Sequence, residues 1–265
     1  MDAHIFAGLD GISRSSKPRT RGLTMVADWG MGLNAQQDLV ATGAAHCDFA
    51  KIAVGISRLL SDDLLTAKIK HYQGYQIEPF PGGQYLEYAE VCGRADLYFP
   101  AVVRAGYRWV EVSDNLAPVE VAWKQRMIRQ AAEKFGLAVL GEVGKKEGLP
   151  NAFSLTDNAR ACLDAGARIV LLEAAELVSD DPGTARAVEA VVEAVGPERL
   201  MFELPGPWIA GVSASDIHRM RNLFIERFGP EVNLGNVGPA DLISLEAYRR
   251  GLGVNAGKMK TESAS

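Results

Sequence analysis

Cysteine is scarce in this chain, and its apolar runs are short. The three cysteines among 265 residues, Cys47, Cys92 and Cys162, are too few and too scattered for a disulfide framework, and none has a Cys or His partner at metal-ligand spacing. No apolar run approaches the roughly 18 residues of a membrane span. The segment 1–22 has no apolar stretch typical of a signal peptide. We therefore expect a cytoplasmic protein with reduced cysteines and no membrane partner.

Clusters of basic residues are also absent. No basic run is longer than Lys145-Lys146 or Arg249-Arg250, and 28 basic residues stand against 33 acidic ones, for a formal net charge of −5. A nucleic-acid interface needs a clustered basic face, so we expect no nucleic-acid partner. The hydrophobic fraction of 48% and the charged fraction of 23% are those of an ordinary globular protein with a large core.

The sequence does contain a repeated alternation of an apolar run with a helical stretch. The apolar runs are Leu23–Trp29, Asp48–Val54, Tyr75–Phe80, Trp109–Ser113, Leu137–Gly141, Arg168–Leu172, Leu200–Phe202 and Val232–Leu234. Strand-then-helix units without a hairpin signal predict a single-domain α/β protein, a (β/α)8 TIM barrel over 23–253. We expect a flexible leader over 1–22 and a flexible tail over 254–265.

An open doubly wound sheet is the alternative to the barrel. It would usually show a Gly-x-Gly-x-x-Gly fingerprint after its first strand, and the segment from Gly30 to Ala35 is an incomplete match. Helix boundaries can be predicted in either fold. Ser61 is expected to cap one helix and Thr156 another, and the apolar spacing over 118–135 predicts a third.

In a barrel, functional side chains lie at the carboxyl ends of the strands. The predicted ends carry more acids than bases, namely Asp28, Lys51, Glu78, Glu111, Asp114, Glu142, Lys145, Glu173 and Glu203. Acids that face one another cannot all ionise unless a cation shares the space. Two to four carboxylates around one ion would suit Mg²⁺. The alternative is a set of ion pairs with Lys51, Lys145 and local arginines.

Two lysines are candidates for the chemistry itself. Lys145 follows Glu142 by three residues, and Lys51 lies in the second apolar run. Either could transfer a proton or stabilise an enolate, because burial and neighbouring charges shift the pKa of a lysine. A Schiff-base role is the alternative.

Two glycine-containing segments are candidates for binding an anion. The segment Asn233–Gly238 leads into a helix at Pro239, whose free backbone amides could hold a phosphate or a carboxylate. Pro81-Gly82-Gly83 could be a second loop that lets a ligand approach the backbone. Each could equally be an ordinary turn between a strand and a helix.

The motifs together resemble one known family. Asp28-Trp-Gly-Met-Gly-Leu-Asn34, Glu111-Val-Ser-Asp114, Glu142-Val-Gly-Lys-Lys146 and Val232-Asn-Leu-Gly-Asn236 are similar to segments of the phosphosulfolactate synthase (ComA-like) family, in the same order. The resemblance, which spans Leu23 to Leu252, implies a (β/α)8 barrel that is often oligomeric. It also implies Mg²⁺-dependent addition of sulfite to phosphoenolpyruvate in coenzyme M synthesis, with Lys145 acting on the enol(ate) carbon and acids at the strand ends holding the metal.

The chain departs from the family pattern where cations are expected. Trp29 replaces a lysine, Ala175 replaces an arginine, and the arginine expected near the end is Gly253. Each lost cation that faced a phosphate or sulfonate would forfeit about 1.5 to 3 kcal/mol of charge-assisted hydrogen bonding. A mouth lined by Trp29, Val54 and Ala175 favours a less charged or larger substrate.

The sequence therefore predicts three groups of site residues. The catalytic residues are expected to be Lys145, Lys51 and Glu142. The predicted substrate-binding residues are Asp28, Asn34, Gly82, Gly83, Ser113, Asn233, Gly235 and Asn236. The predicted ligands of a Mg²⁺ cofactor are Glu111, Asp114, Glu173 and Glu203.

Three hypotheses about function follow. The first is a Mg²⁺-dependent lyase or synthase that adds a nucleophile, sulfite in the family, to phosphoenolpyruvate or an enolpyruvyl-like acceptor. The second is a diverged barrel enzyme that acts on a less anionic substrate in secondary metabolism. The third is a non-catalytic scaffold homologue. We expect a small anionic or partly apolar substrate and a homo-oligomer.

Overall fold

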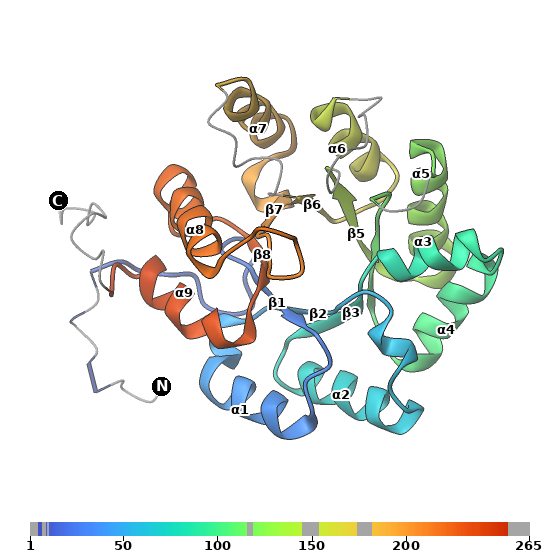
Figure 1. Ribbon diagram of the computed structural model, residues 1–265, viewed down its shortest axis with the longest axis horizontal. Helices are drawn as coiled ribbons and strands as arrows, with labels where there is room; N and C mark the ends of the chain where they lie inside the picture. The colour runs from blue at the N-terminus through green and yellow to red at the C-terminus, as the bar shows by residue number, and fades with distance from the viewer. Residues whose placement is uncertain are drawn as a thin grey trace.

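A computed structural model of the chain describes residues 5–6, 9, 11–115, 119–144, 154–173 and 182–253, with the side chains of 182–185 excepted. Strands gather at the centre of the molecule and helices surround them (Figure 1). The strands form one eight-stranded sheet: β1 (Thr24–Asp28), β2 (Phe49–Ile52), β3 (Glu78–Pro81), β4 (Trp109–Val112), β5 (Ala138–Val143), β6 (Ile169–Glu173), β7 (Leu200–Glu203) and β8 (Leu234–Val237).

The strands form a nearly closed barrel. Their hydrogen-bonded order is β3-β2-β1-β8-β7-β6-β5-β4, and every pairing in the sheet is parallel. The first strand pairs with the last, and β3 and β4, at the two ends of the order, contact each other. The predicted single-domain (β/α)8 barrel is confirmed, and the doubly wound alternative is excluded.

Two prolines explain why β3 and β4 are not joined by a ladder of backbone hydrogen bonds. The amides of Glu78 and Gly82 donate to carbonyls on the β2 side, each at 2.9 Å. In a strand, alternate amides point to opposite edges, so the positions that face β4 are Pro79 and Pro81. Proline has no N–H to donate. The barrel therefore has a seam between β3 and β4.

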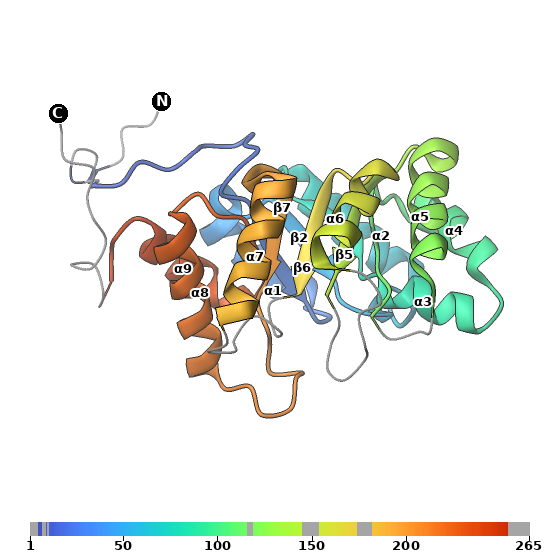
Figure 2. The same ribbon diagram turned by 90° about the horizontal axis from the view of Figure 1, so that it is seen from above.

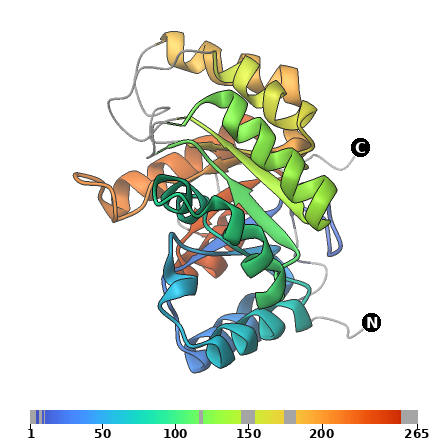
Figure 3. The ribbon, with the colours of Figure 1, turned by 90° about the vertical axis from the view of Figure 1, so that its right-hand side faces the viewer.

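Helices cover the outside of the barrel, as the two side views show (Figures 2 and 3). In the described residues they are α1 (Leu33–Gly43), α2 (Asp62–Gly74), α3 (Gln84–Val91), α4 (Tyr98–Ala105), α5 (Val121–Arg129), α6 (Leu155–Asp164), α7 (Pro182–Val195), α8 (Ala214–Phe228) and α9 (Leu242–Arg249). Ser61 caps α2, as predicted. Thr156 does not cap α6: Ser154 accepts from the amide of Asp157, and Thr156 lies inside the first turn. Among the described residues, no helix has both the length and the apolarity to cross a bilayer.

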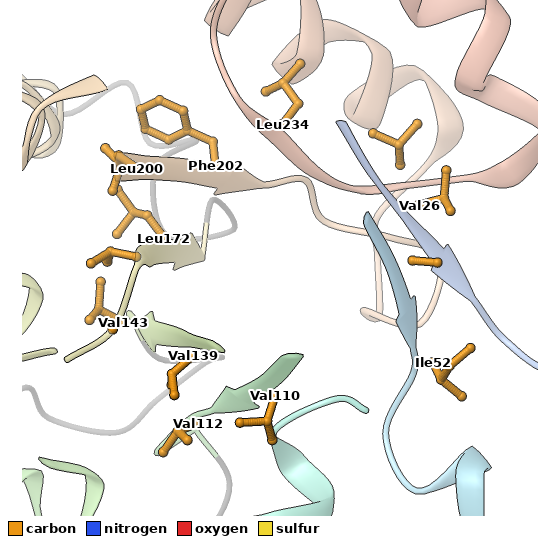
Figure 4. Close-up of a cluster of buried hydrophobic side chains, with 14 of the residues drawn as sticks. Val26, Ile52, Val110, Val112, Val139, Val143, Leu172, Leu200, Phe202 and Leu234 are labelled. Atoms are coloured by element: carbon orange, nitrogen blue, oxygen red, sulfur yellow. The ribbon is translucent and has the colours of Figure 1, made fainter. Parts of the chain in front are cut away.

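Alternate residues of each strand face two different cores. The outer core lies between the sheet and the helices and includes Val26, Ile52, Val110, Leu172 and Leu234 (Figure 4). The inner core lies inside the barrel, before the carboxyl ends of the strands, and consists of Leu23, Met25, Phe49, Phe80, Leu140, Ile169, Leu171 and Met201. Burying both faces of a parallel strand explains why each run is apolar throughout. The same alternation decides which residues at the carboxyl ends face the interior.

The eighth strand begins later than predicted, and this moves Asn233 to the opposite end of the barrel. Val232 belongs to a turn in which its amide donates to the carbonyl of Gly229, and β8 starts at Leu234. Asn233, at the amino end, accepts from the amide of Leu23 at 2.9 Å. The prediction that Asn233 binds substrate is therefore wrong, because its side chain joins strands on the far side from the carboxyl ends.

The predicted leader is in part packed against the amino end of the barrel. Residues 11–22 are described, and within them the guanidinium of Arg14 is buried between Glu231 and Glu246, at 3.0 and 3.3 Å. Arg19 pairs with Asp48 at 2.9 Å. These contacts hold the segment to the barrel, whereas the sequence predicted a loose leader. Residues 1–4, 7–8 and 10 and the predicted tail, 254–265, lie outside the described residues.

We predict that Asn233→Ala lowers the free energy of unfolding by about 3 kcal/mol, because it leaves several buried backbone groups without partners. The Asn233 amide group donates to the carbonyls of Pro197, Glu198 and Leu200 at 2.9 to 3.3 Å. Urea unfolding followed by circular dichroism measures the effect. Asn34→Ala, at an exposed position of α1, is the matched control and should change stability by less than about 0.5 kcal/mol. Equal midpoints for the two variants would contradict the prediction.

Candidate active site

Four glutamates and one lysine meet inside the barrel at the carboxyl ends of its strands. Glu111, Glu142, Glu173 and Glu203 lie on β4 to β7 and are all buried, as is Lys51 on β2. Each lies two residues after a residue of the same strand that belongs to the inner core or packs against it. Because alternate side chains of a strand face the same side, all five face inward. We call this set the acid layer. It is the part of the barrel where the inner core changes from apolar to charged.

Lys51 is held between two of these acids. Its Nζ lies 2.8 Å from Oε2 of Glu111 and 2.8 Å from Oε1 of Glu203. Burial alone would lower the pKa of Lys51, but Glu111, Glu203 and Glu142 together raise it well above its ordinary value. The lysine therefore keeps its proton and its positive charge more strongly than a lysine at the surface. Such a group can stabilise an anion but is a poor general base.

The acid layer also affects its own protonation. Burial raises the pKa of Glu111 well above its ordinary value; Lys51 opposes this, while the negative charges of Glu142 and Glu203 raise it further. Glu111 therefore holds a proton more readily than a surface glutamate. Such a proton relieves part of the repulsion among the buried carboxylates.

Three of the acids form a group that fits a divalent cation. Glu142, Glu173 and Glu203 each offer an oxygen atom, and these oxygens lie within 4.8 Å of one another. A buried, all-carboxylate donor set is what a hard cation such as Mg²⁺ binds. Of the four predicted metal ligands, Glu173 and Glu203 are in this group, and Glu142, predicted as catalytic, joins them.

Two members of the acid layer, Lys51 and Glu111, line a cavity of about 440 Å³. Its polar lining comes from Lys51, Glu111, Gln84 and Asn236 and from the glycines Gly82 and Gly83. The remaining walls are apolar, formed by Ala27, Trp29, Ala53, Val54, Trp208, Ile209 and Ala210. The cavity is of a size suited to a small molecule, and it places one polar end of such a molecule against Lys51.

Glycines allow the walls of this cavity to approach closely. A Cβ on Gly83 would lie 2.5 Å from Oγ of Ser113 and 3.0 Å from Oε1 of Glu111. A Cβ on Gly235 would lie 2.5 Å from Cε of Met25, under the acid layer. Gly83 therefore leaves no room for a side chain, whereas at Gly235 the terminal methyl of Met25 would have to move to admit one. These close contacts are with protein atoms, so the predicted approach of a ligand to the glycine pair after β3 stays a prediction.

Two non-glycine residues of the cavity wall have a left-handed backbone. Val54 has φ = 43° and Asn236 has φ = 56°. This conformation is rare for a β-branched residue such as valine, and backbone strain of this kind concentrates at functional sites. Asn236 lies within β8 and lines the cavity, so the predicted anion loop is part of a strand. The carbonyl of the preceding residue, Gly235, accepts a hydrogen bond from the amide of Leu204 at 3.0 Å.

Two tryptophans stand at the mouth of the cavity. The ring centroids of Trp29 and Trp208 are 5.1 Å apart, and the rings are tilted by 38°. Both residues line the cavity, and both remain substantially exposed, at 46% and 36%. Trp208 lies in the connection between β7 and α8, which projects beyond the barrel (Figure 2). Trp208 was not predicted as a site residue, because nothing in its local sequence indicates a functional position.

Asp28 and Asp114 face outward, away from the acid layer. Both Asp28 oxygens are engaged: Oδ2 lies 2.8 Å from Nζ of Lys68 and accepts from Tyr72, and Oδ1 accepts from two backbone amides. Asp114 pairs with Lys124 at 2.9 Å. The structure thus places neither the predicted substrate ligand Asp28 nor the predicted metal ligand Asp114 in the cavity. Each instead ties a strand end to a helix.

Ser113 and Asn34 also lie outside the cavity lining. Ser113 is buried and donates to Glu87, and Asn34 is exposed near the start of α1. The predicted catalytic residue Lys145, together with Lys146 and Ala175, lies outside the described residues. Glu78, counted among the strand ends, starts β3 and pairs with Arg108 at the surface.

A second row of polar residues supports the acid layer and was not predicted. The amide group of Asn115 donates to Oε1 of Glu142 at 2.5 Å, and its backbone amide donates to Glu87 at 3.1 Å. Lys124 donates to the backbone carbonyl of Glu142 at 2.9 Å. These contacts fix the carboxylate and the main chain of Glu142. They join residues up to 28 positions apart, so local patterns could not reveal them.

The chain is similar along its length to known synthases. A model of the family described as (2R)-phospho-3-sulfolactate synthase (ComA) matches residues 12–255. The phosphosulfolactate synthase of Methanothermobacter thermautotrophicus is 33% identical over 250 residues, which cover 90% of this chain and 92% of that protein. The phosphosulfolactate synthase of Methanocaldococcus jannaschii is 31% identical over 245 residues, or 88% and 92% of the two chains. That of Bacillus subtilis is 27% identical over 250 residues, or 90% and 93%.

Solved structures agree on the fold. A 3-hexulose-6-phosphate synthase superimposes with a TM-score of 0.51 at 16% identity, covering 86% of this chain and 98% of that chain. At this identity the likeness concerns the barrel alone. The family match extends through the barrel, and two relatives exceed 30% identity over most of both chains. The chain therefore belongs to the phosphosulfolactate synthase (ComA) family.

Proposed function

We propose that this protein is a phosphosulfolactate synthase that adds sulfite to phosphoenolpyruvate, with Mg²⁺ as its cofactor. The observation that carries the proposal is the acid layer: one buried ammonium and a three-glutamate group at the carboxyl end of a barrel. The chain matches synthases of this name along most of their length. Anion stabilisation by a fixed cation beside a divalent-ion site is what an addition to an enol phosphate requires.

The proposed reaction adds sulfite across the double bond of the acceptor. The lone pair on sulfur attacks the terminal carbon and forms the C–S bond. The π electrons move to the carbon that bears the phosphoryl oxygen and are delocalised into its carboxylate. A proton then adds to that carbon. Sulfite, phosphoenolpyruvate and one proton are consumed, nothing leaves, and the phosphoryl group stays on its oxygen.

In this scheme Lys51 stabilises the charge that develops on the acceptor carboxylate. Its raised pKa keeps it protonated, which suits electrostatic stabilisation and disfavours the Schiff-base alternative, since that role needs a neutral amine. Lys51 and Glu111 both line the cavity, so an anionic oxygen of the acceptor can reach the ammonium. The proton donor remains the predicted one, Lys145.

Glu142, Glu173 and Glu203 are the residues that would hold Mg²⁺. When bound, the ion would supply positive charge next to the oxygens of the enolate-like intermediate. Asn115 and Lys124 orient Glu142 through its side chain and main chain. Supporting contacts of this kind keep ligands in place at metal sites.

A diverged activity is the second candidate, and the tryptophan pair favours it. Trp29 and Trp208 place aromatic surface at the cavity mouth, where an acceptor with an apolar group would bury area that phosphoenolpyruvate lacks. The same barrel and the same addition would then serve a less anionic acceptor. The two candidates differ in the substrate and share the acid layer.

We predict that Lys51→Met lowers kcat/KM for sulfite and phosphoenolpyruvate by at least about 100-fold, because the transition state loses a fixed cation. Product formation is followed by phosphorus NMR with Mg²⁺ present. Lys17→Met, at the amino end of the barrel where Lys17 donates to the carbonyl of Ala44, is the control and should retain activity. Wild-type turnover by the Lys51 variant would contradict its role. No product from the wild-type protein would contradict the proposed substrates.

Mg²⁺ affinity should fall at least about tenfold in Glu173→Gln, since one charged oxygen ligand becomes a neutral amide. Isothermal titration calorimetry with MgCl₂ measures this without substrate. Glu78→Gln, which removes a surface acid at the amino end, should bind Mg²⁺ like the wild type. If both variants bind with unchanged affinity, the three-glutamate group is not the metal site.

Trp29→Lys distinguishes the two candidate functions. If the natural acceptor is phosphoenolpyruvate, a lysine at the mouth should raise kcat/KM for it by about tenfold through a charge-assisted contact. If the acceptor carries an apolar group, the same variant should lose activity toward a phenyl-substituted enolpyruvyl ether that the wild type accepts. Steady-state rates with both acceptors decide between these outcomes.

A further inference from the structure

A second cavity lies outside the barrel, next to the seam between β3 and β4. Its volume is about 620 Å³, within the range of small-molecule sites. It is bounded by α2, α3 and α4 and by the connection after β2, and Pro81 of the seam is part of its lining. Figure 3 views the molecule from the side on which α3 and α4 lie. Gly82 and Gln84 line the first cavity and Tyr85 lines the second, so the start of α3 separates the two.

The charges around this second cavity are mainly positive. Arg58, Arg94 and Arg104 line it, with Asp62 as the acid among its lining residues. All three arginines are exposed, and within the described part of the chain none of them forms an ion pair. The chain as a whole has a formal net charge of −5. A local excess of unpaired guanidinium groups on an acidic protein favours an anion, which arginine can bind through two parallel hydrogen bonds.

The body of the cavity is aromatic and apolar. The rings of Tyr85 and Tyr88 are stacked, with centroids 6.5 Å apart, and Tyr85 meets Tyr98 edge to face at 5.5 Å. Leu65 and Val102 are buried apolar residues of the same lining. Flat aromatic walls of this kind bind another ring by offset or edge contacts.

Tyr98 is one of the lining residues, and its hydroxyl, which is closed to solvent, has no hydrogen-bond partner in the described residues. Tyr98 is 5% exposed, and its Oη makes no hydrogen bond there. Neighbouring Tyr107, by contrast, shares a 2.8 Å hydrogen bond with Ser57. Burial, followed by the negative charge of Glu111, raises the pKa of Tyr98 well above its ordinary value, so the hydroxyl stays neutral and can donate. A buried polar group without a partner is costly unless a ligand or water supplies one.

We propose that this cavity, which we call the seam site, binds a small aromatic carboxylate or sulfonate. The ring of the ligand would lie among the tyrosines, and its anionic group would face Arg94 and Arg104. The site lies beside the edge at which β3 and β4 are not hydrogen-bonded, and Pro81 is part of its lining. It uses no residue of the acid layer, so it stands independently of the proposed synthase activity.

Anilinonaphthalene sulfonate is a suitable probe, because it combines a fused ring with one sulfonate and becomes fluorescent in apolar surroundings. Fluorescence titration of the folded wild-type protein should give one bound probe per chain. Arg94→Gln/Arg104→Gln should weaken binding by about tenfold or more. Arg126→Gln/Arg129→Gln, which removes two exposed charges from α5, should leave the affinity unchanged.

Other outcomes would overturn the proposal. The first cavity is also partly apolar, so Trp29→Ser serves to locate the probe; loss of binding in this variant, with unchanged affinity in Arg94→Gln/Arg104→Gln, would place it there. Ala101→Trp, which fills the seam site from an exposed position of α4, should abolish binding, and full binding by this variant would contradict the site. Absence of binding to the wild type, as expected if a second copy of the chain covers the cavity, would also overturn it.

Discussion

The charge balance around Lys51 is the constraint on which the site depends. Four buried glutamates share the interior with one lysine, whose ammonium contacts Glu111 and Glu203 at 2.8 Å. Burying ionised carboxylates is costly unless positive charge lies nearby. Two features of the described residues reduce this cost. The raised pKa of Glu111 allows it to keep a proton, and the oxygens of the other three acids lie close enough together to bind a divalent cation. The acid layer is thus built for a cation and for an anion bound beside it.

Much of the fold was predictable because a parallel barrel leaves a simple record in the sequence. Each strand is buried on both faces, so each appears as a short apolar run, and each crossover adds a helix. The same double burial hides the direction of each side chain. Nothing in the first run shows whether Ala27 or Asp28 faces the interior, and the structure places Ala27 in the cavity and Asp28 against Lys68. Val232 is apolar although it precedes β8, so the predicted eighth run began too early and Asn233 was wrongly included in the strand.

The outward acids show why the rest of the site could not be predicted. Asp28 and Asp114 pair with Lys68 and Lys124, which lie on α2 and α5, the helices that pack beside these strand ends. Such ion pairs anchor a helix to a strand. In the sequence, their aspartates cannot be distinguished from active-site acids, because both kinds of acid lie at strand ends. Only the three-dimensional structure distinguishes these two aspartates from Glu142, Glu173 and Glu203. The distinction depends on which alternate residues of each strand face the barrel interior and on contacts between distant segments.

The two ends of the barrel divide stability from function. At the amino end, Asn233 and the fully buried Arg249 satisfy backbone carbonyls around the strands, and the burial of Arg249 lowers its pKa to about 9. At the carboxyl end, the chain tolerates a left-handed valine at position 54 and a cluster of like charges, both of which cost folding free energy. A rigid amino end lets the carboxyl end hold an arrangement that would be unfavourable alone. The seam between β3 and β4 lies on the side of the barrel, and the second cavity lies next to it, with Pro81 in its lining.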